Sequence, residues 1–244
     1  IADEATFNEE HLYECRETLQ NVLSDSVYNV RVCFGIYRTD NMNESLSFMC
    51  DKASFAVASI KDDTHSFIAY YDDTMLEAAI KYKTIVDEFD DAIKAGEFKM
   101  YLQPQISAKT RRLTGAEALV RRIKPDGTII SPIDFIPVYE KSGLISRLDR
   151  YIWEQAAAKL GEWKKAGINM SISVNISPKD FYYIDIFNTF AGLIKKYDIE
   201  PSNLKIEITE TTIMSDVPNL MGELEELRKA GFTLEMDDFG SGYS

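Results

Sequence analysis

The sequence predicts an α/β fold with a largely parallel sheet, as in a (β/α)8 barrel. Strand-like runs alternate with amphipathic helices over residues 98–244, an order typical of βαβ units. Asn175 and Glu207 are 32 positions apart, and Glu207 and Asp237 are 30 apart. One unit of such a barrel averages ~31 residues. Both the alternation and the spacing therefore favour a barrel.

The first region, residues 1–74, is predicted to be a smaller α/β domain. Its apolar residues recur at helical spacing in two segments and alternate in two others, which are the patterns of helices and strands. The expected elements are a helix at Glu9–Leu23, a strand at Val30–Ile36, a helix around Met49–Ile60 and a strand at Ser66–Tyr71. Asn43 or Glu44 is expected near the start of the second helix.

A long helix is predicted to connect the two regions, over residues 75–97. Apolar residues recur at helical spacing from Met75 to Ala95, and Gly96 closes the segment. It contains no proline and no Ser/Gly-rich stretch, so we expect a rigid connection rather than a flexible tether.

The second region, residues 98–244, carries the strands and helices of the predicted barrel. The expected strands are Lys99–Gln103, Ala116–Arg121, Ser171–Ser177, Leu204–Glu210 and Phe232–Asp238. Helices are expected around residues 152–163, before Gly167, and around residues 186–197. A third helix is expected to be capped by Asp216, to carry Pro218 in its first turn and to end before Gly231, as the usual preferences for these residues indicate.

The three later strands each combine an apolar face with a polar one. Asn175, Glu207 and Asp237 lie on the polar faces, and the carboxyl ends of barrel strands converge on one mouth. Their oxygen donors suit magnesium or manganese. An antiparallel sheet with one solvated face gives the same alternation, so this pattern by itself leaves that alternative open.

Composition narrows the possible partners. A net charge of −13 argues against binding to a nucleic-acid polymer, because that affinity comes from Lys and Arg. A small phosphate ester remains possible if metal ions or a local arginine offset the acidic field. No segment is apolar for the ~20 residues that a membrane helix needs, and the N-terminus does not resemble a signal peptide. The three cysteines suggest no disulfide framework, so a cytoplasmic location is expected.

Motifs at the same strand ends resemble those of the EAL family. Glu117-Ala118-Leu119-Val120-Arg121 is similar to the Glu-Ala-Leu-x-Arg motif that names it. Further matches, in family order, are Tyr101-Leu102-Gln103-Pro104, the segment Pro132–Gly143 with Phe135-Ile136-Pro137 and Glu140, Ser173–Ser177, Glu207-Ile208-Thr209-Glu210 and Asp237–Ser244. One such tripeptide is common in proteins, but this ordered series is highly specific.

The resemblance implies a TIM-like EAL barrel that hydrolyses cyclic-di-GMP to pGpG with two magnesium or manganese ions, and that forms homodimers through this domain. The implied metal ligands are Glu117, Asn175, Glu207, Asp237 and Asp238, of which Glu117, Asp237 and Asp238 are also the catalytic residues. Arg121 is expected to bind a substrate phosphate and Gln103 to line the guanine or phosphate pocket. Glu210 is expected to stabilise the loop that follows Asp237.

The sequence departs from the family pattern in one respect. It ends at Ser244, within the loop motif, and the family uses a Lys and a Glu on later strands. We therefore expect a longer polypeptide to complete the barrel. A catalytically inactive EAL module that senses cyclic-di-GMP or binds another protein is the alternative function.

The first region resembles the C-terminal part of a GGDEF domain. Val32–Ile36 is similar to a strand of that domain, and Asp51–Ala58 is similar to one of its helices. The Gly-Gly-Glu-Glu-Phe motif is absent from the sequence, so the resemblance implies a degenerate domain without diguanylate cyclase activity.

Overall fold

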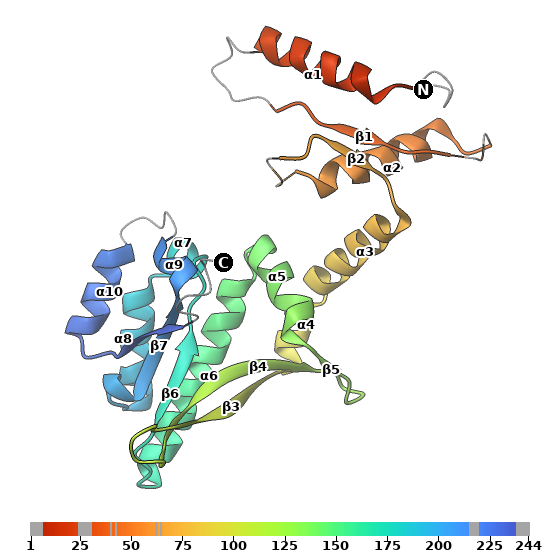
Figure 1. Ribbon diagram of the computed structural model, residues 1–244. Helices are drawn as coiled ribbons and strands as arrows, with labels where there is room; N and C mark the ends of the chain where they lie inside the picture. Colours follow the sequence, from red (N-terminus) through yellow and green to blue (C-terminus); the bar gives the residue numbers. More distant parts are fainter. Residues whose placement is uncertain are drawn as a thin grey trace. The chain divides into compact units, whose positions relative to one another are not determined.

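The computed structural model describes residues 7–23, 31–39, 41, 43–61, 63, 65–214 and 220–237. Internal contacts divide the chain into two compact units, Ile1–Lys83 and Thr84–Ser244. Each unit has its own sheet (Figure 1), and each is described by itself below.

The first unit is a small α/β arrangement, as the sequence predicts. It contains helices α1 (Glu9–Leu23) and α2 (Leu46–Ser59) and strands β1 (Phe34–Ile36) and β2 (Ile68–Tyr70). The two strands pair in parallel, and α2 packs against both. The start of α2 differs from the prediction, because the side chain of Ser45 caps it by accepting a hydrogen bond from the Phe48 amide. Part of the predicted first strand, including Val30, lies outside the described residues.

The predicted helix over residues 75–95 is helical in the structure but divided at Glu88. The structure has two helices instead, α3 (Asp73–Asp87) and α4 (Phe89–Lys94). They are separated at Glu88, whose carboxylate accepts a hydrogen bond at 2.7 Å from the buried guanidinium of Arg122. Glu97 accepts a second one from the same group at 2.9 Å. This contact with a distant strand is a tertiary constraint that helical periodicity does not reveal.

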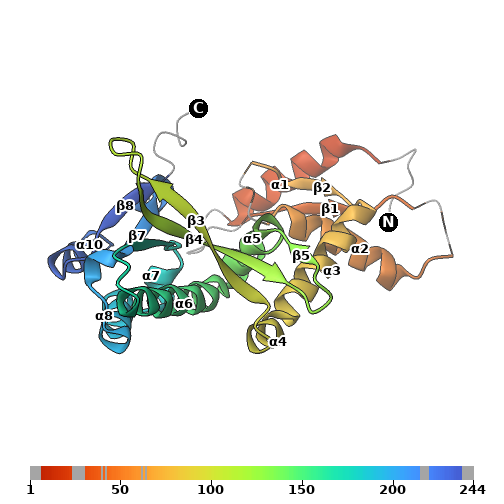
Figure 2. The same ribbon diagram turned by 90° about the horizontal axis from the view of Figure 1, so that it is seen from below.

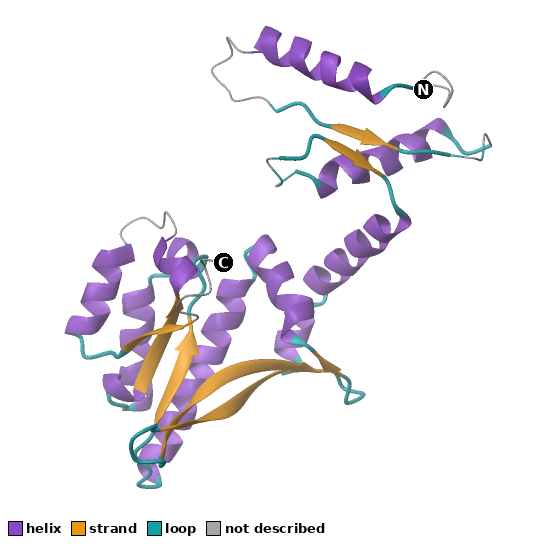
Figure 3. Ribbon diagram, in the orientation of Figure 1, coloured by secondary structure: helices purple, strands orange, loops and turns teal. Residues whose placement is uncertain are grey.

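The described part of the second unit contains a mixed six-stranded sheet in the order β3-β4-β6-β7-β8, with β5 paired to β4. Figure 3 shows these strands in orange. Their bounds are β3 Phe98–Ile106, β4 Leu113–Ile123, β5 Ile129–Ile130, β6 Ser171–Asn175, β7 Leu204–Thr209 and β8 Leu234–Asp237. The pairs β4-β6, β6-β7 and β7-β8 are parallel, which confirms a largely parallel sheet. The solvated antiparallel alternative is therefore wrong for these strands, and only β3 and β5 pair antiparallel with β4.

Helices α6, α8 and α10 lie along one face of this sheet (Figure 2). The helices of the second unit beyond α4 are α5 (Pro132–Ser142), α6 (Ile145–Lys165), α7 (Asp180–Tyr183), α8 (Ile186–Tyr197), a 3-10 turn (Pro201–Asn203), α9 (Glu210–Met214) and α10 (Leu220–Lys229). The third predicted helix is thus present, whereas Asp216 and Pro218 lie outside the described residues. Among the described helices, none is both long and apolar enough to cross a bilayer.

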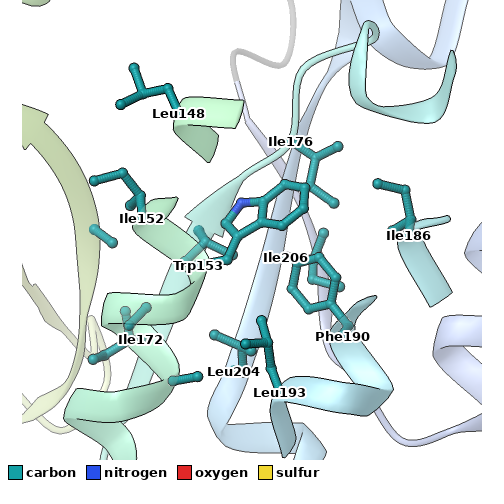
Figure 4. Packing of buried hydrophobic residues seen from close by; sticks show 14 of the residues in the cluster. Leu148, Ile152, Trp153, Ile172, Ile176, Ile186, Phe190, Leu193, Leu204 and Ile206 are labelled. Carbon is teal, nitrogen blue, oxygen red and sulfur yellow. The ribbon is translucent and has the colours of Figure 1, made fainter. Parts of the chain in front are cut away.

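The core forms where the apolar faces of β6 and β7 meet α6 and α8. Ile172, Leu204 and Ile206 are fully buried there. Trp153 of α6 packs against Phe190 of α8 with ring centroids 4.8 Å apart (Figure 4). Because side chains alternate along a strand, burial of this face turns the intervening polar residues to the opposite face.

Candidate active site

The strand register brings the predicted metal-ligand residues to one face of the sheet. Glu117 on β4 pairs with Ser173 on β6, and Asn175, two residues further, pairs with Glu207 on β7. Glu207 in turn pairs with Glu235 on β8, two residues before Asp237. Residues two apart on a strand share a face, so these side chains form a stepped polar row across four strands.

A hydrogen bond joins two of the predicted ligands. Asn175 Nδ2 donates to Glu117 Oε1 at 3.1 Å. Both side chains are half-buried, at the last paired position of their respective strands with the next strand. This bond uses the amide nitrogen of Asn175, and the oxygen of the same amide is an acceptor. That oxygen is therefore available as a metal ligand beside the carboxylate of Glu117.

Glu207 is the most buried carboxylate of the row, with 6% of its surface exposed. Its Oε1 accepts a hydrogen bond at 3.2 Å from Gln105 Nε2, which also donates to Ser173 Oγ at 3.1 Å. Burial raises the pKa of Glu207, and the charges of Glu117, Glu235 and Asp237 raise it further, while a hydrogen bond with Ser173 opposes them. Negative charge is therefore concentrated on this face.

The sequence reasoning missed Gln105 and Ser173. Gln105 is two residues beyond Gln103 on β3, and Ser173 is two residues before Asn175 on β6. The period of two along a strand places each on the face of its predicted neighbour, and this signal was available from sequence. The contact of Gln105 with Glu207, in contrast, depends on the arrangement of strands that are far apart in the chain.

The remaining predicted residues are placed as follows. Gln103 pairs with Glu117 across β3 and β4, and its side chain is exposed. Asp237 ends β8 and is also exposed. Glu210 directly follows β7 as the first residue of α9. Asp238 and the loop that Glu210 is expected to stabilise lie outside the described residues.

A cavity of about 290 Å³ adjoins the row, between β4, β6, α5 and α6. Arg121, Asn175, Glu140 and Asp149 are among its lining residues. Arg121 is four residues beyond Glu117 on the same strand, hence on the same face. The cavity thus combines apolar walls with a guanidinium and several acceptors, a typical ligand pocket.

Two neighbouring aspartates at this cavity were not predicted from the sequence: Asp149, which lines it, and the fully buried Asp180. Asp180, at the start of α7, is fully buried and accepts a hydrogen bond from the Ser177 amide at 2.8 Å. Burial raises its pKa to about 6. Burial also raises the pKa of Asp149, and the neighbouring Asp180 adds to that shift. Each of the two carboxyls therefore binds a proton more readily than an exposed aspartate does.

The donor set of the row suits a divalent cation. Carboxylates and an amide oxygen are the ligands that magnesium and manganese prefer, and a cation would relieve the charge accumulated around Glu207. Within the described part of the chain, no three carboxylate, histidine or cysteine side chains already converge as a metal-binding group. The row is therefore suited in chemistry, and its acidic side chains would have to draw together around an ion.

Comparison with known proteins identifies similar chains. The cyclic di-GMP phosphodiesterase PA2567 of Pseudomonas aeruginosa is 32% identical over 177 residues, covering 72% of this chain and 30% of its own length. The bifunctional diguanylate cyclase/cyclic di-GMP phosphodiesterase MucR of the same organism is 26% identical, over 100% of this chain and 35% of its own length. The solved structure of PaMucR phosphodiesterase in complex with c-di-GMP has a TM-score of 0.62 and 30% identity, covering 66% of each chain.

The chain spans between 24% and 35% of the length of the first curated relatives that it matches. The family model described as the EAL domain matches residues 86–244, which is the second unit almost in full. The mixed α/β fold, the ordered motifs and this match agree, and the chain belongs to the EAL-domain family.

Proposed function

We propose that this chain carries the N-terminal part of a TIM-like (β/α)8 barrel that hydrolyses cyclic-di-GMP to pGpG. The observation that carries the proposal is the stepped row of Glu117, Asn175, Glu207 and Asp237 beside a cavity that Arg121 lines. Similarity to a cyclic di-GMP phosphodiesterase and to a c-di-GMP complex supports the choice of substrate.

In this proposal, Glu117, Asn175, Glu207 and Asp237, with Asp238, hold two magnesium or manganese ions. Bound ions of this kind neutralise charge on phosphate oxygens and lower the pKa of water. Asn175 orients Glu117 through their hydrogen bond, and Gln105 holds Glu207 in place. Arg121 binds a non-bridging phosphate oxygen, Gln103 contributes to the substrate pocket, and Glu210 anchors the loop after Asp237.

The test is incubation of the purified whole protein, with the barrel complete, with cyclic-di-GMP and Mn²⁺, followed by chromatographic separation of the nucleotides. We expect linear pGpG from the wild type and none from Glu117→Gln, which removes a charge and keeps the side-chain size. Glu162→Gln is the matched control, because Glu162 is exposed on α6 outside the polar row. Equal turnover by the wild type and Glu117→Gln would refute the assignment.

Binding of cyclic-di-GMP without hydrolysis is a second candidate function. The solved c-di-GMP complex of a similar chain supports binding of this nucleotide. A sensor would show saturable binding by isothermal titration calorimetry with and without EDTA, and no pGpG after long incubation with Mn²⁺. Hydrolysis that EDTA abolishes would exclude this alternative.

For the first unit we propose a degenerate GGDEF-like domain over residues 1–74, followed by the helical connection 75–97 and the EAL domain from residue 98. The parallel β1-β2 pair with α2 against it and the alignment of MucR along the full chain support this assignment. No conversion of GTP to cyclic-di-GMP is expected.

We also propose a cytoplasmic homodimer formed through the EAL domain. The free cysteines of the chain accord with a reducing compartment. Sedimentation velocity would test whether the protein is a dimer.

A further inference from the structure

An ion pair lies within the polar row, next to the proposed metal ligands. Lys205 Nζ of β7 contacts Glu235 Oε1 of β8 at 2.6 Å. Lys205 is two residues before Glu207 on the same face, and Glu235 is directly opposite Glu207. The pair is partly shielded, since 23% of the Lys205 side chain and 33% of the Glu235 side chain are exposed.

The charge balance of the face depends on this contact. Glu117, Glu207, Glu235 and Asp237 are four carboxylates on the same face of neighbouring strands. Lys205 binds one of them, Glu235, and directs its carboxylate toward the start of β7. Three carboxylates are then left to face the end of the strands where Asn175 is located.

Stabilisation of the fold is a weak reason for such a pair. Partly exposed ion pairs contribute little to stability, because desolvation and loss of side-chain freedom offset the attraction. Loss of one charge of such a pair beside a site for a doubly charged ion has a larger effect on that ion, since the interaction energy scales with the product of the charges.

We propose that Lys205 is a positioning residue that holds Glu235 out of the cation pocket and so sets the affinity of the pocket for divalent ions. This inference rests on the proposed function, because it requires the cation to bind at the polar row. The charge that the ion meets then comes from Glu117, Glu207 and Asp237, with the charge of Glu235 cancelled by Lys205.

The proposal predicts shifts of opposite sign for the two partners. Lys205→Met leaves Glu235 uncompensated, and we expect Mn²⁺ to bind about three- to tenfold more tightly at low ionic strength. Glu235→Gln leaves the Lys205 charge uncompensated, and Mn²⁺ should bind about three- to tenfold more weakly. The double variant Lys205→Met/Glu235→Gln should return to within about twofold of the wild type.

The experiment is a calorimetric titration of the purified protein with Mn²⁺ in the absence of nucleotide, with thermal unfolding in EDTA to report folding. Lys159→Met and Glu162→Gln are the controls, because they remove the partners of an ion pair within α6. If a single variant fails to fold, the charge-reversed Lys205→Glu/Glu235→Lys protein, which restores the pair, should bind Mn²⁺ like the wild type.

Opposite shifts with recovery in the double variant support the proposal, since a purely structural pair would weaken binding in both single variants. Shifts of the same sign, or unchanged affinity in both, overturn it and leave the proposed function standing. Failure of the wild type to bind Mn²⁺ overturns both.

Discussion

The indole Nε1 of Trp153 donates a hydrogen bond to the main-chain carbonyl oxygen of Asn175 at 3.0 Å. Trp153 is 1% exposed within the core, whereas Asn175 belongs to the polar row. The bond therefore joins the packing of α6 directly to the end of β6, and the core determines where one of the proposed metal ligands lies.

Replacing Trp153 should disturb both the packing of the core and the position of Asn175. Trp153→Phe keeps an aromatic ring, loses the donor and leaves a small cavity, so we expect a loss of about 1–3 kcal/mol in the free energy of unfolding. Affinity for Mn²⁺ should fall as well, because the Asn175 carbonyl is released. Urea denaturation and calorimetry measure the two effects. Trp163→Phe is the control, since Trp163 is only partly buried, and an equal loss there would contradict the argument.

The hydrogen bond between Asn175 and Glu117 gives a second prediction, tested by adding a negative charge at Asn175. Asn175→Asp replaces a donor with a carboxylate beside Glu117, so without metal the free energy of unfolding should fall by about 1–2 kcal/mol. Addition of Mn²⁺ should raise the melting temperature of the variant more than that of the wild type, because the ion offsets the added charge.

Asn188→Asp provides a matched control for this change. Asn188 Nδ2 donates to Asp185 Oδ2 at 2.8 Å in an exposed part of α8, so the substitution there also sets two carboxylates together. Solvent screens the exposed pair, and neither apo stability nor the Mn²⁺ response should change appreciably. A Mn²⁺ response as large as that of Asn175→Asp would count against cation binding at the polar row.

Gly115 lies where β4 and β6 pair in parallel. A Cβ atom at Gly115 would be 2.5 Å from the main-chain oxygen of Ser171, a distance that only a shift of the strands can relieve. We expect Gly115→Ala to lower the free energy of unfolding by about 1–3 kcal/mol. Gly192→Ala in α8 has open space around the added atom and should instead stabilise by about 0.5–1 kcal/mol. Chemical denaturation distinguishes the two, and destabilisation of similar size in both would contradict this account.

The buried Asp180 predicts a dependence of stability on pH. Its pKa is raised from 3.8 to about 6 by burial, so the folded protein binds the proton more tightly than the unfolded chain does. Its contribution is complete below about pH 3.8 and is lost as the pH rises through about 6. We expect the wild type to lose on the order of 2–3 kcal/mol across this window relative to Asp180→Asn.

Urea denaturation between about pH 4 and pH 7 measures this difference. Asp149 is the neighbour of Asp180, and Glu140 and Ser146 also affect the pKa of these carboxyls. Asp149→Asn should therefore also reduce the loss of stability with rising pH. Asp185→Asn is the control, because hydrogen bonds to Asn188 lower the pKa of Asp185 and its contribution is lost at acidic pH. A wild-type profile with the same slope as Asp180→Asn would refute the assignment.

The sequence predicted the strands well because their composition alternates over short segments. Leu204, Ile206 and Ile208 alternate with polar residues, and all three are buried against the helices, although Glu207 between them is buried as well. Direction of pairing is not encoded in this way, so the antiparallel β3-β4 pair was not predicted. β3 also continues through Pro104, which an edge strand tolerates because it leaves one row of amides unpaired.

The candidate site was predictable to the extent that motifs mark individual residues. Glu117, Asn175 and Glu207 are found on one face, as expected. Contacts such as that of Gln105 with Glu207 join residues 102 positions apart, and no local pattern specifies them. The same holds for the ion pair between Glu88, at the division of the two helices, and Arg122 on β4.

The stepped register of the polar row restricts how this site can change. An insertion of one residue within β6 or β7 would turn Asn175 or Glu207 from the polar face into the packed helices. Changes of two residues would keep the face and move the side chain one rung along the sheet. Changes in chain length near the site are therefore tolerable mainly in the loops beyond the strands, and within the strands the chemistry can diversify only by exchange of one side chain for another.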